Sequence, residues 1–130
     1  MTFFKPLSIL SLFCCCLFFT ACGSRQDTPA AAAKSMAKAM QRGDIEAIMC
    51  LLNPADITQA GEEQVSRLLI ASLADINDGE QGIQKVEILE ETITADQATV
   101  KVRYDYGNGT QADKVMHLVQ IEGKWYLRLM

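Results

Sequence analysis

Beyond an apolar start, the hydrophobic positions follow a helical period first and a strand period afterwards. From Thr28 to about residue 79, apolar residues recur three and four places apart, as Ala33, Met36 and Met40 do. This spacing places them on one face of a helix. From Gln84 onward, apolar and polar residues alternate, as they do in a half-buried strand. The pattern predicts helices in the first half of the domain and strands in the second.

Capping signals divide the first half into three helices. Thr28-Pro29 starts the first helix, and Gly43 suits the left-handed residue that follows a helix end. Asp44 caps a second, short helix, which Asn53-Pro54 ends. The third helix begins at Gly61, where two glutamates complement the helix dipole. Its expected buried face consists of Val65, Leu68, Leu69, Ser72, Leu73 and Ile76.

Turn signals divide the second half into four strands. The expected strands cover residues 85–93, 98–106, 111–120 and 125–130. Gly107-Asn108-Gly109 is typical of a hairpin turn, because its residues tolerate a positive φ. Strands joined by short turns form an antiparallel meander, and amphipathic helices need a surface to cover. The sequence therefore predicts an α+β domain with its helices on one side of a four-stranded sheet.

A set of turn and core residues carries a resemblance to a known family. These residues are Gly43-Asp44, Gly82-Ile83, Val86, Ile88, Ala95-Asp96-Gln97-Ala98-Thr99-Val100, Leu118-Val119 and Gly123-Lys124-Trp125. Over roughly residues 28–130 the chain resembles a domain-of-unknown-function family of small bacterial lipoproteins in the nuclear-transport-factor-two-like, or cystatin-like, superfamily. The resemblance implies a cone: three N-terminal helices packed on the concave face of a curved four-stranded antiparallel sheet, sometimes enclosing a pocket. The superfamily includes isomerases, dehydratases and inert binding modules, so the resemblance indicates a fold and no chemistry.

The first 22 residues have the pattern of an export signal. A short positive start that includes Lys5 precedes an apolar run over residues 7–21. That run of about 15 residues is shorter than the roughly 20 that span a bilayer, so it is typical of a signal peptide. Phe19-Thr20-Ala21-Cys22 resembles the lipobox of a bacterial lipoprotein signal, in which the cysteine becomes lipidated. The alternative is a general secretory signal that is cut nearby and leaves Cys22 as an ordinary thiol.

The lipobox resemblance implies a division of the chain into three parts. Residues 1–21 form a cleaved lipoprotein signal peptide, residues 22–27 a lipidated cysteine with a flexible tether, and residues 28–130 a single domain. Several acyl chains, palmitate among them, anchor such a protein to the membrane far more firmly than one chain does. Gly23 follows the cysteine, which by analogy with sorting in Gram-negative lipoproteins favours the outer membrane. We expect a lipid-anchored protein of the bacterial cell envelope that faces the periplasm.

The charge balance excludes some partners. The formal net charge is −4 at pH 7, and removing residues 1–21 takes away only Lys5 from 12 basic residues, which leaves 11 against 16 acidic residues and a net charge of −5. Nucleic-acid binding needs a basic face, and a negative chain also argues against a polybasic grip on anionic lipid headgroups. The chain has no glycine-rich phosphate loop and no histidine-rich metal spacing. We expect no nucleic acid, cofactor or metal.

The third expected strand favours a non-catalytic interaction or support module. It is apolar on both faces: Val115, Val119 and Ile121 lie on one, Met116 and Leu118 on the other. One face should meet the helices, and exposed apolar surface commonly marks an interaction site. An envelope protein, or a second copy of the chain in a homodimer, would then cover the remaining face. Cover by flanking loops, or a bulge that swaps the faces, is the alternative.

The interior of the cone is a second candidate site, for a small apolar ligand. The side chains suited to line it are Met36, Met40, Tyr104, Tyr106, His117 and Trp125. Ligand pockets are mostly apolar and carry few polar groups, which this set satisfies. The same side chains fill a solid core equally well.

An acid–base enzyme of the same superfamily is the remote alternative. On strict alternation, His117 shares a strand face with Asp113, and a His–Asp–Tyr group with Tyr104 or Tyr106 is conceivable. No nearby residue completes a nucleophile triad, and strand residues of this kind more often form a structural hydrogen bond. We therefore expect no enzymatic activity.

Overall fold

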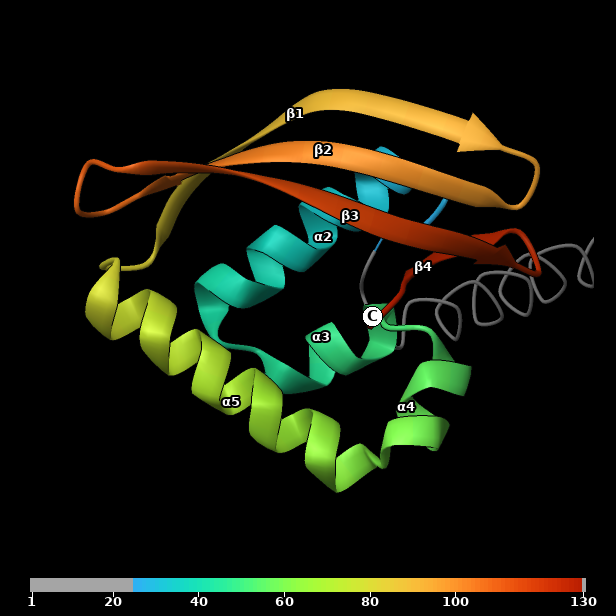
Figure 1. Ribbon diagram of the computed structural model, residues 1–130, viewed down its shortest axis with the longest axis horizontal. Coiled ribbons are helices and arrows are strands. Elements are labelled where there is room, and N and C mark those ends of the chain that lie inside the picture. Colours follow the sequence, from blue (N-terminus) through green and yellow to red (C-terminus); the bar gives the residue numbers. More distant parts are fainter. Residues whose placement is uncertain (1–24, 130) are drawn as a thin grey trace, which may run out of the picture.

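The computed structural model describes residues 25–129 as four helices followed by four strands (Figure 1). The helices are α2 (Pro29–Arg42), α3 (Ile45–Leu51), α4 (Pro54–Ala60) and α5 (Glu62–Gly79). The strands are β1 (Ile83–Thr94), β2 (Gln97–Tyr106), β3 (Gln111–Ile121) and β4 (Lys124–Leu127). The predicted α+β class is confirmed. The predicted signal peptide, residues 1–21, and the lipidation of Cys22 lie outside the described residues.

The predicted caps of the first two helices are confirmed. The Thr28 hydroxyl accepts a hydrogen bond of 3.0 Å from the Ala31 N–H at the start of α2. Gly43 ends that helix with a φ of 66°, a left-handed conformation that glycine adopts at little cost. The Asp44 carboxylate accepts a bond of 3.1 Å from the Ala47 N–H and so starts α3.

A fourth helix, α4, corrects the prediction of three. Asn53 and Pro54 were expected only to end a helix, but they also start the next one. The Asn53 side chain accepts a hydrogen bond of 3.2 Å from the Ala55 N–H, and Pro54 occupies the first turn of α4, where its missing N–H costs nothing. An Asn-Pro pair therefore closes α3 and opens α4 without a loop between them.

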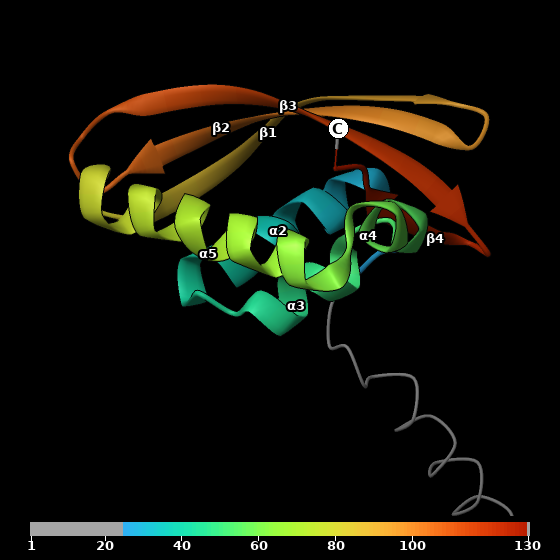
Figure 2. The same ribbon diagram turned by 60° about the horizontal axis from the view of Figure 1, so that its bottom comes forward.

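The four strands pair in the order β1-β2-β3-β4, each antiparallel to its neighbour. The sheet arches over the helices (Figure 2). β2 and β3 pair along nearly their whole length, from Gln97 opposite Val119 to Asp105 opposite Gln111. β4 pairs only with the last part of β3, from Leu118 to Ile121. The first half of β3 is therefore not covered by β4.

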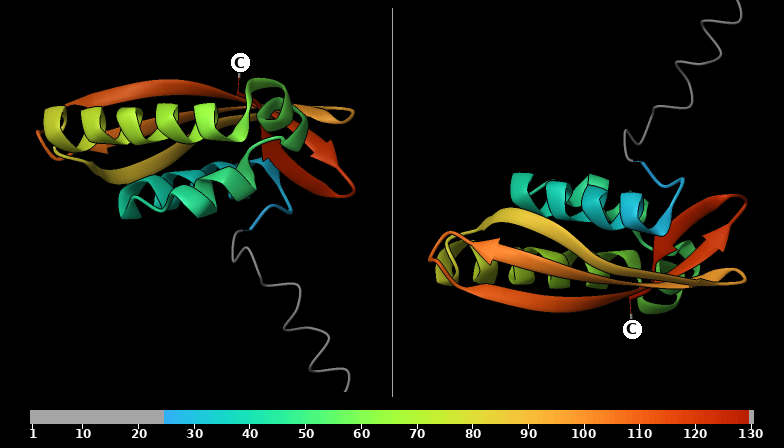
Figure 3. Two further views of the ribbon diagram at one scale, coloured as in Figure 1. Left: turned by 90° about the horizontal axis from the view of Figure 1, so that it is seen from below. Right: turned by 90° about the horizontal axis from the view of Figure 1, so that it is seen from above.

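The helices cover the concave side of the sheet in two rows. In both views of Figure 3, α2 and α3 lie along the β1 side and α5 lies along the β3 side. α2 packs against β1, β2 and β4, whereas α5 packs mainly against α3 and α4. The fully buried aliphatic side chains come from both layers: Ile48, Leu51, Val65, Val100, Val102 and Leu118. These side chains form one continuous core between the helices and the sheet.

The expected buried face of the third helix, α5, is only partly correct. Val65 and Leu73 are buried, but Leu68 is 57% exposed and Ser72 is exposed too. Because α5 packs mainly against α3 and α4 rather than flat on the sheet, its contact face is narrower than the apolar stripe in its sequence. No helix within residues 25–129 is long and apolar enough to cross a membrane.

Residues 25–26 pack on the domain, which corrects the expected flexible tether at its C-terminal end. Gln26 is 8% exposed, and its side-chain amide donates a hydrogen bond of 3.0 Å to the Trp125 carbonyl. The Trp125 N–H donates in return to the Gln26 carbonyl, at 2.9 Å. Arg25 is held to α2 by two hydrogen bonds with the Ser35 hydroxyl. The ordered domain therefore begins before residue 28.

Gly107 fixes the β2–β3 hairpin against the end of α5, so we predict that Gly107→Ala destabilises the fold. Its N–H donates 2.9 Å to the Gly82 carbonyl, and an added Cβ would collide with the Gln81 carbonyl oxygen and approach the Gln81 Cβ to 2.9 Å. Overpacking of this kind costs about 1–3 kcal/mol of unfolding free energy. Urea unfolding followed by circular dichroism measures the loss.

Gly79→Ala is the matched control for that prediction. Gly79 lies at the end of α5, and a Cβ there meets nothing within 4 Å. Because alanine is the better helix former, the control leaves the unfolding free energy equal or slightly higher. Equal losses in the two variants would contradict the role assigned to the Gly107 contact.

Candidate functional site

A pocket of about 420 Å³ lies on the concave side of the sheet, between the strands and helices α2 and α5. Its walls are mostly apolar or aromatic, and three charged side chains accompany them. The lining residues are Met36, Met40, Asp75, Ile76, Glu80, Tyr104, Tyr106, Lys114, Met116 and Leu127. A volume of this size lies within the range of small-molecule sites.

Simple periodicities bring the pocket walls together. Met36 and Met40 are four residues apart, so they lie one above the other on the inner flank of α2. Tyr104 and Tyr106 are two apart on β2, so both point to the concave side, and the same rule places Met116 on that side of β3. The interior of the sheet and the inner flank of α2 therefore supply the apolar wall.

The charged lining residues mark the mouth of the pocket. Asp75 on α5 and Lys114 on β3 are exposed, and Glu80 is half-buried. Lys114 belongs to the half of β3 that β4 does not cover. The mouth therefore opens between α5 and this part of β3, and the two methionines line the inner wall.

Tyr104 lines the pocket with a ring that is largely buried. Its side chain is 3% exposed, and within residues 25–129 the hydroxyl forms no hydrogen bond. Its ring stands edge-on to that of Tyr106, with 6.3 Å between the ring centroids. Burial raises the pKa of the Tyr104 phenol well above its usual range, so the hydroxyl stays protonated and can donate a hydrogen bond. A molecule bound in the pocket could supply an acceptor for this hydroxyl.

Glu80 places a carboxylate beside Tyr106 at the mouth. It accepts weak hydrogen bonds from the Asn108 amide at 3.4 Å and from the Thr110 hydroxyl at 3.5 Å, both in the β2–β3 hairpin. Burial and, secondly, the Glu80 charge raise the pKa of the Tyr106 phenol. Glu80, at the mouth of the pocket, is therefore hydrogen-bonded to the same hairpin that Gly107 holds in place.

Four of the six predicted ligand-binding residues meet in this pocket, and two do not. Met36, Met40, Tyr104 and Tyr106 line it. His117 is exposed on the convex face of the sheet, opposite Thr99, because it occupies an outward position of β3. Trp125 is 4% exposed and belongs to the core beneath Gln26, away from the pocket. The prediction is therefore wrong for His117 and Trp125 as lining residues.

The conceivable His–Asp–Tyr group does not assemble. His117 and Asp113 lie on the convex face of β3, whereas Tyr104 and Tyr106 point to the concave side. Asp113 is engaged by Arg103, whose guanidinium donates at 2.8 Å and 3.2 Å to the two carboxylate oxygens. These hydrogen bonds lower the pKa of Asp113. The sheet thus separates the imidazole from both phenols.

The second apolar face of β3 is exposed, as predicted. Val115 is 58% exposed, Ile121 is 39% exposed and Val119 is half-buried, all on the convex side. Met116 and Leu118 point the other way, and Leu118 is buried in the core. We name Val115, Val119 and Ile121 the convex strip. Within the described part of the chain, neither flanking loops nor a change of face covers it.

Sequence reasoning missed six of the lining residues: Asp75, Ile76, Glu80, Lys114, Met116 and Leu127. Alternation along β3 is a signal for two of them, because Lys114 and Met116 share the inward face with Leu118. Asp75 and Glu80 carry no such signal, since their place depends on how α5 is tilted against the sheet. Within residues 25–129 no cluster of histidine, cysteine or acidic side chains is arranged to hold a metal ion.

Comparison with known families identifies the family of the chain. A family described as a domain of unknown function, DUF4878, matches residues 20–128. The chain belongs to the DUF4878 family. No curated protein matches the sequence of this DUF4878 chain.

Solved structures show that this DUF4878 domain has a nuclear-transport-factor-two-like (NTF2-like) fold. A Campylobacter jejuni protein, described provisionally as an NTF2-like transpeptidase, has a TM-score of 0.66 and 23% identity over 78% of this chain and 98% of its own. An NTF2-like protein of unknown function from Silicibacter pomeroyi has a TM-score of 0.53 and 21% identity, covering 75% and 85% of the two chains. At such identities the likeness extends to the fold alone.

The buried phenol of this DUF4878 domain predicts a pH effect on stability. The unfolded chain ionises Tyr104 as the pH rises through about 10, while the folded chain keeps it protonated. The pKa of the Tyr104 phenol is higher in the folded chain than in the unfolded chain. Its contribution to the unfolding free energy is therefore present below about pH 10 and is lost as the pH rises further. Tyr104→Phe removes this loss. Between about pH 9 and 11, the unfolding free energy of the variant therefore declines by roughly 1 kcal/mol less than that of the wild type.

Urea titrations at the two pH values measure that difference. Tyr126→Phe is the matched control, because Tyr126 is a half-buried tyrosine of β4 that does not line the pocket. An equal reduction of the decline in both variants would contradict the special role of the Tyr104 environment.

Proposed function

We propose that this DUF4878 protein is a membrane-anchored, non-catalytic binding module that holds a small, largely apolar molecule in its concave pocket. The observation that supports this role best is the Tyr104 hydroxyl, which lines an apolar-walled pocket and has no hydrogen-bond partner among the described residues. A molecule in the pocket that carries a hydrogen-bond acceptor would pair with this donor.

The pocket defines the chemistry of the proposed ligand. Three methionines and a leucine form flexible apolar walls, which adapt to an irregular apolar body. The Tyr104 and Tyr106 hydroxyls favour a hydrogen-bond acceptor on that body. The charged residues stand at the mouth, where a polar end of the ligand stays in contact with water.

The two phenols of the pocket support ligand binding. The raised pKa values keep both phenols protonated at neutral pH, so they donate hydrogen bonds and do not act as bases. The histidine of the chain lies on the other side of the sheet. The two phenols can therefore orient a ligand through hydrogen bonds.

The proposed anchor rests on the sequence before the described domain. Residues 7–21 are an apolar run of signal-peptide length, and Thr20-Ala21-Cys22-Gly23 follows the lipobox pattern. We place the domain at the outer membrane, facing the periplasm, with the acylated Cys22 in the bilayer. Binding of an envelope protein or of a second copy on the convex strip stays a prediction from its exposure.

Native mass spectrometry of residues 23–130, produced in the periplasm without the anchor, tests the proposed pocket. The described domain carries its own core, so this fragment folds. We expect a retained small molecule, which Met40→Trp displaces because the larger side chain fills the pocket. Tyr104→Phe removes one hydrogen bond worth about 1 kcal/mol, so affinity for the extracted molecule falls about fivefold.

The control is Ala74→Trp, which introduces the same side chain at an exposed position of α5 outside the pocket. It retains the molecule. The proposal fails if the wild-type fragment carries no molecule, or if Met40→Trp retains it as well as the control does.

Intact-mass analysis of the full protein from bacterial membranes tests the anchor. We expect a chain that begins at Cys22 and carries acyl chains, and metabolic labelling with an alkyne fatty acid that disappears in Cys22→Ser. Cys50→Ser changes the other cysteine of residues 22–130 and keeps the label. A label that persists in Cys22→Ser, or an unmodified chain, would exclude lipidation at this cysteine.

A further inference from the structure

The net negative charge of the chain conceals a basic segment at the start of the domain. Residues 25–42 contain four basic residues and a single acidic one, Asp27. Residues 43–129 contain seven basic and fifteen acidic residues. The positive charge of the domain is therefore concentrated in α2 and the residues directly before it.

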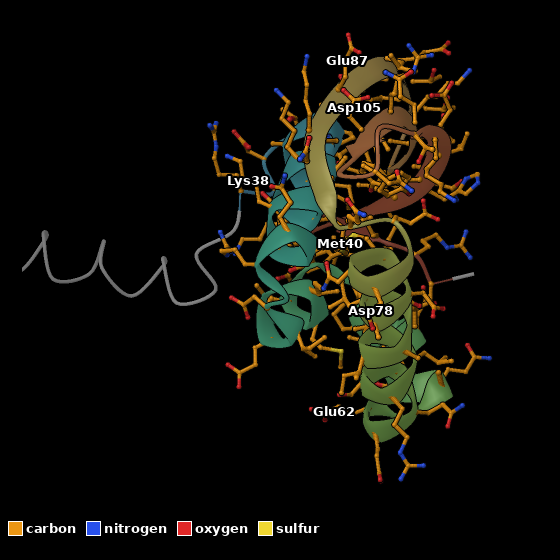
Figure 4. All side chains as sticks on the ribbon, turned by 90° about the vertical axis from the view of Figure 1, so that its left-hand side faces the viewer. Lys38, Met40, Glu62, Asp78, Glu87 and Asp105 are labelled. Carbon is orange, nitrogen blue, oxygen red and sulfur yellow. The ribbon has the colours of Figure 1, made fainter. Side chains whose placement is uncertain are left out.

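The basic residues of α2 share one flank of the helix. Lys34, Lys38 and Arg42 follow one another at intervals of four, and all three are exposed. At 100° per residue, their mean direction is about 180° from that of Met36 and Met40, which line the pocket. In Figure 4, Lys38 projects from the outer flank of α2, and Met40 lies on the inner side, between α2 and α5.

Arg25 adds a further cation at the same place. Its N–H donates to the Ser35 hydroxyl at 3.2 Å, and that hydroxyl donates to the Arg25 carbonyl at 3.0 Å. The two bonds hold Arg25 beside Lys34 and Lys38, and the three cations border a shallow depression of about 230 Å³. We name Arg25, Lys34 and Lys38 the basic flank.

Nearby acids offset part of the charge of the basic flank, because Asp27 forms an ion pair with Arg25. Asp27 lies 3.5 Å from the Arg25 guanidinium, and Glu91 accepts a hydrogen bond of 2.8 Å from the Ala30 N–H. Lys34 and Lys38 form no ion pair within residues 25–129. Both lysines therefore keep their charge available for an anionic surface.

The proposed lipid anchor is attached to the chain at this same flank. Only Gly23 and Ser24 separate Cys22 from Arg25. Three residue steps reach at most about 11 Å, even when fully extended. Since Arg25 is fixed to Ser35, an acylated Cys22 can lie no farther than that from the basic flank.

We propose that the basic flank docks on anionic phospholipid headgroups and orients the anchored domain on the membrane. This inference rests on the lipid anchor of the proposed function. Headgroup potentials act within about one Debye length, roughly 8 Å at physiological salt, and the short link keeps the basic flank close to that zone. Docking turns the opposite, pocket-lining flank of α2 away from the bilayer.

Lysine footprinting of the full lipidated protein in vesicles tests the docking. The protein is reconstituted in phosphatidylcholine alone or with about 30% phosphatidylglycerol, and an N-hydroxysuccinimide ester labels the exposed lysines. We expect labelling of Lys34 and Lys38 to fall about threefold in the anionic vesicles, and high salt to restore it. Labelling of Lys101 and Lys114, exposed on the sheet, stays the same in both vesicles.

The outcomes separate docking from anchoring. A protein that floats with the vesicles but labels equally at Lys34 and Lys38 in both compositions overturns the docking alone. An equal fall at Lys101 overturns it as well, because the effect is then not specific to the basic flank. A protein that fails to float with either vesicle overturns the anchor, and the docking with it.

Discussion

The packing of α2 against the inner face of the sheet is the contact on which the rest of the structure depends. Its small alanines, Ala33 and Ala37 among them, are fully buried and let the helix approach β1, β2 and β4 closely. With this buried face turned to the sheet, Met36 and Met40 line the cavity while Lys34 and Lys38 are exposed. One helix thus forms the apolar wall of the pocket and carries the charged surface of the domain.

Alternation along β2 and β3 divides the side chains between two surfaces with different properties. The concave side holds two phenols that burial keeps protonated, in an apolar environment suited to a ligand. The convex side holds the Arg103–Asp113 ion pair, His117 and the convex strip in contact with water. Because a strand cannot turn one residue over without turning its neighbours, the imidazole and the phenols stay apart.

The sequence predicted the elements well, because caps and periods are local. The helix ends are capped by residues next to them in the sequence, namely Thr28, Gly43 and Asp44. The period of two along β2 determines which side chains point inward. The features that the sequence did not predict depend on contacts between segments that are distant along the chain. Asp75 and Glu80 join the pocket through the tilt of α5, and Gln26 is buried because it meets Trp125, which is 99 residues away along the chain. The net charge of the chain was misleading too, because a sum over all residues does not show where the basic residues lie.

The Gln26–Trp125 hydrogen bonds also decide how the domain bears a mechanical load. Both bonds tie the first described segment to β4, the last strand of the sheet. A pull on the chain ahead of Arg25 is therefore taken up first by these bonds and by the Ser35 contacts, before it reaches the cap of α2. Such a load passes into β4 and into the Ser35 turn of α2, so it is shared between the sheet and the first described helix.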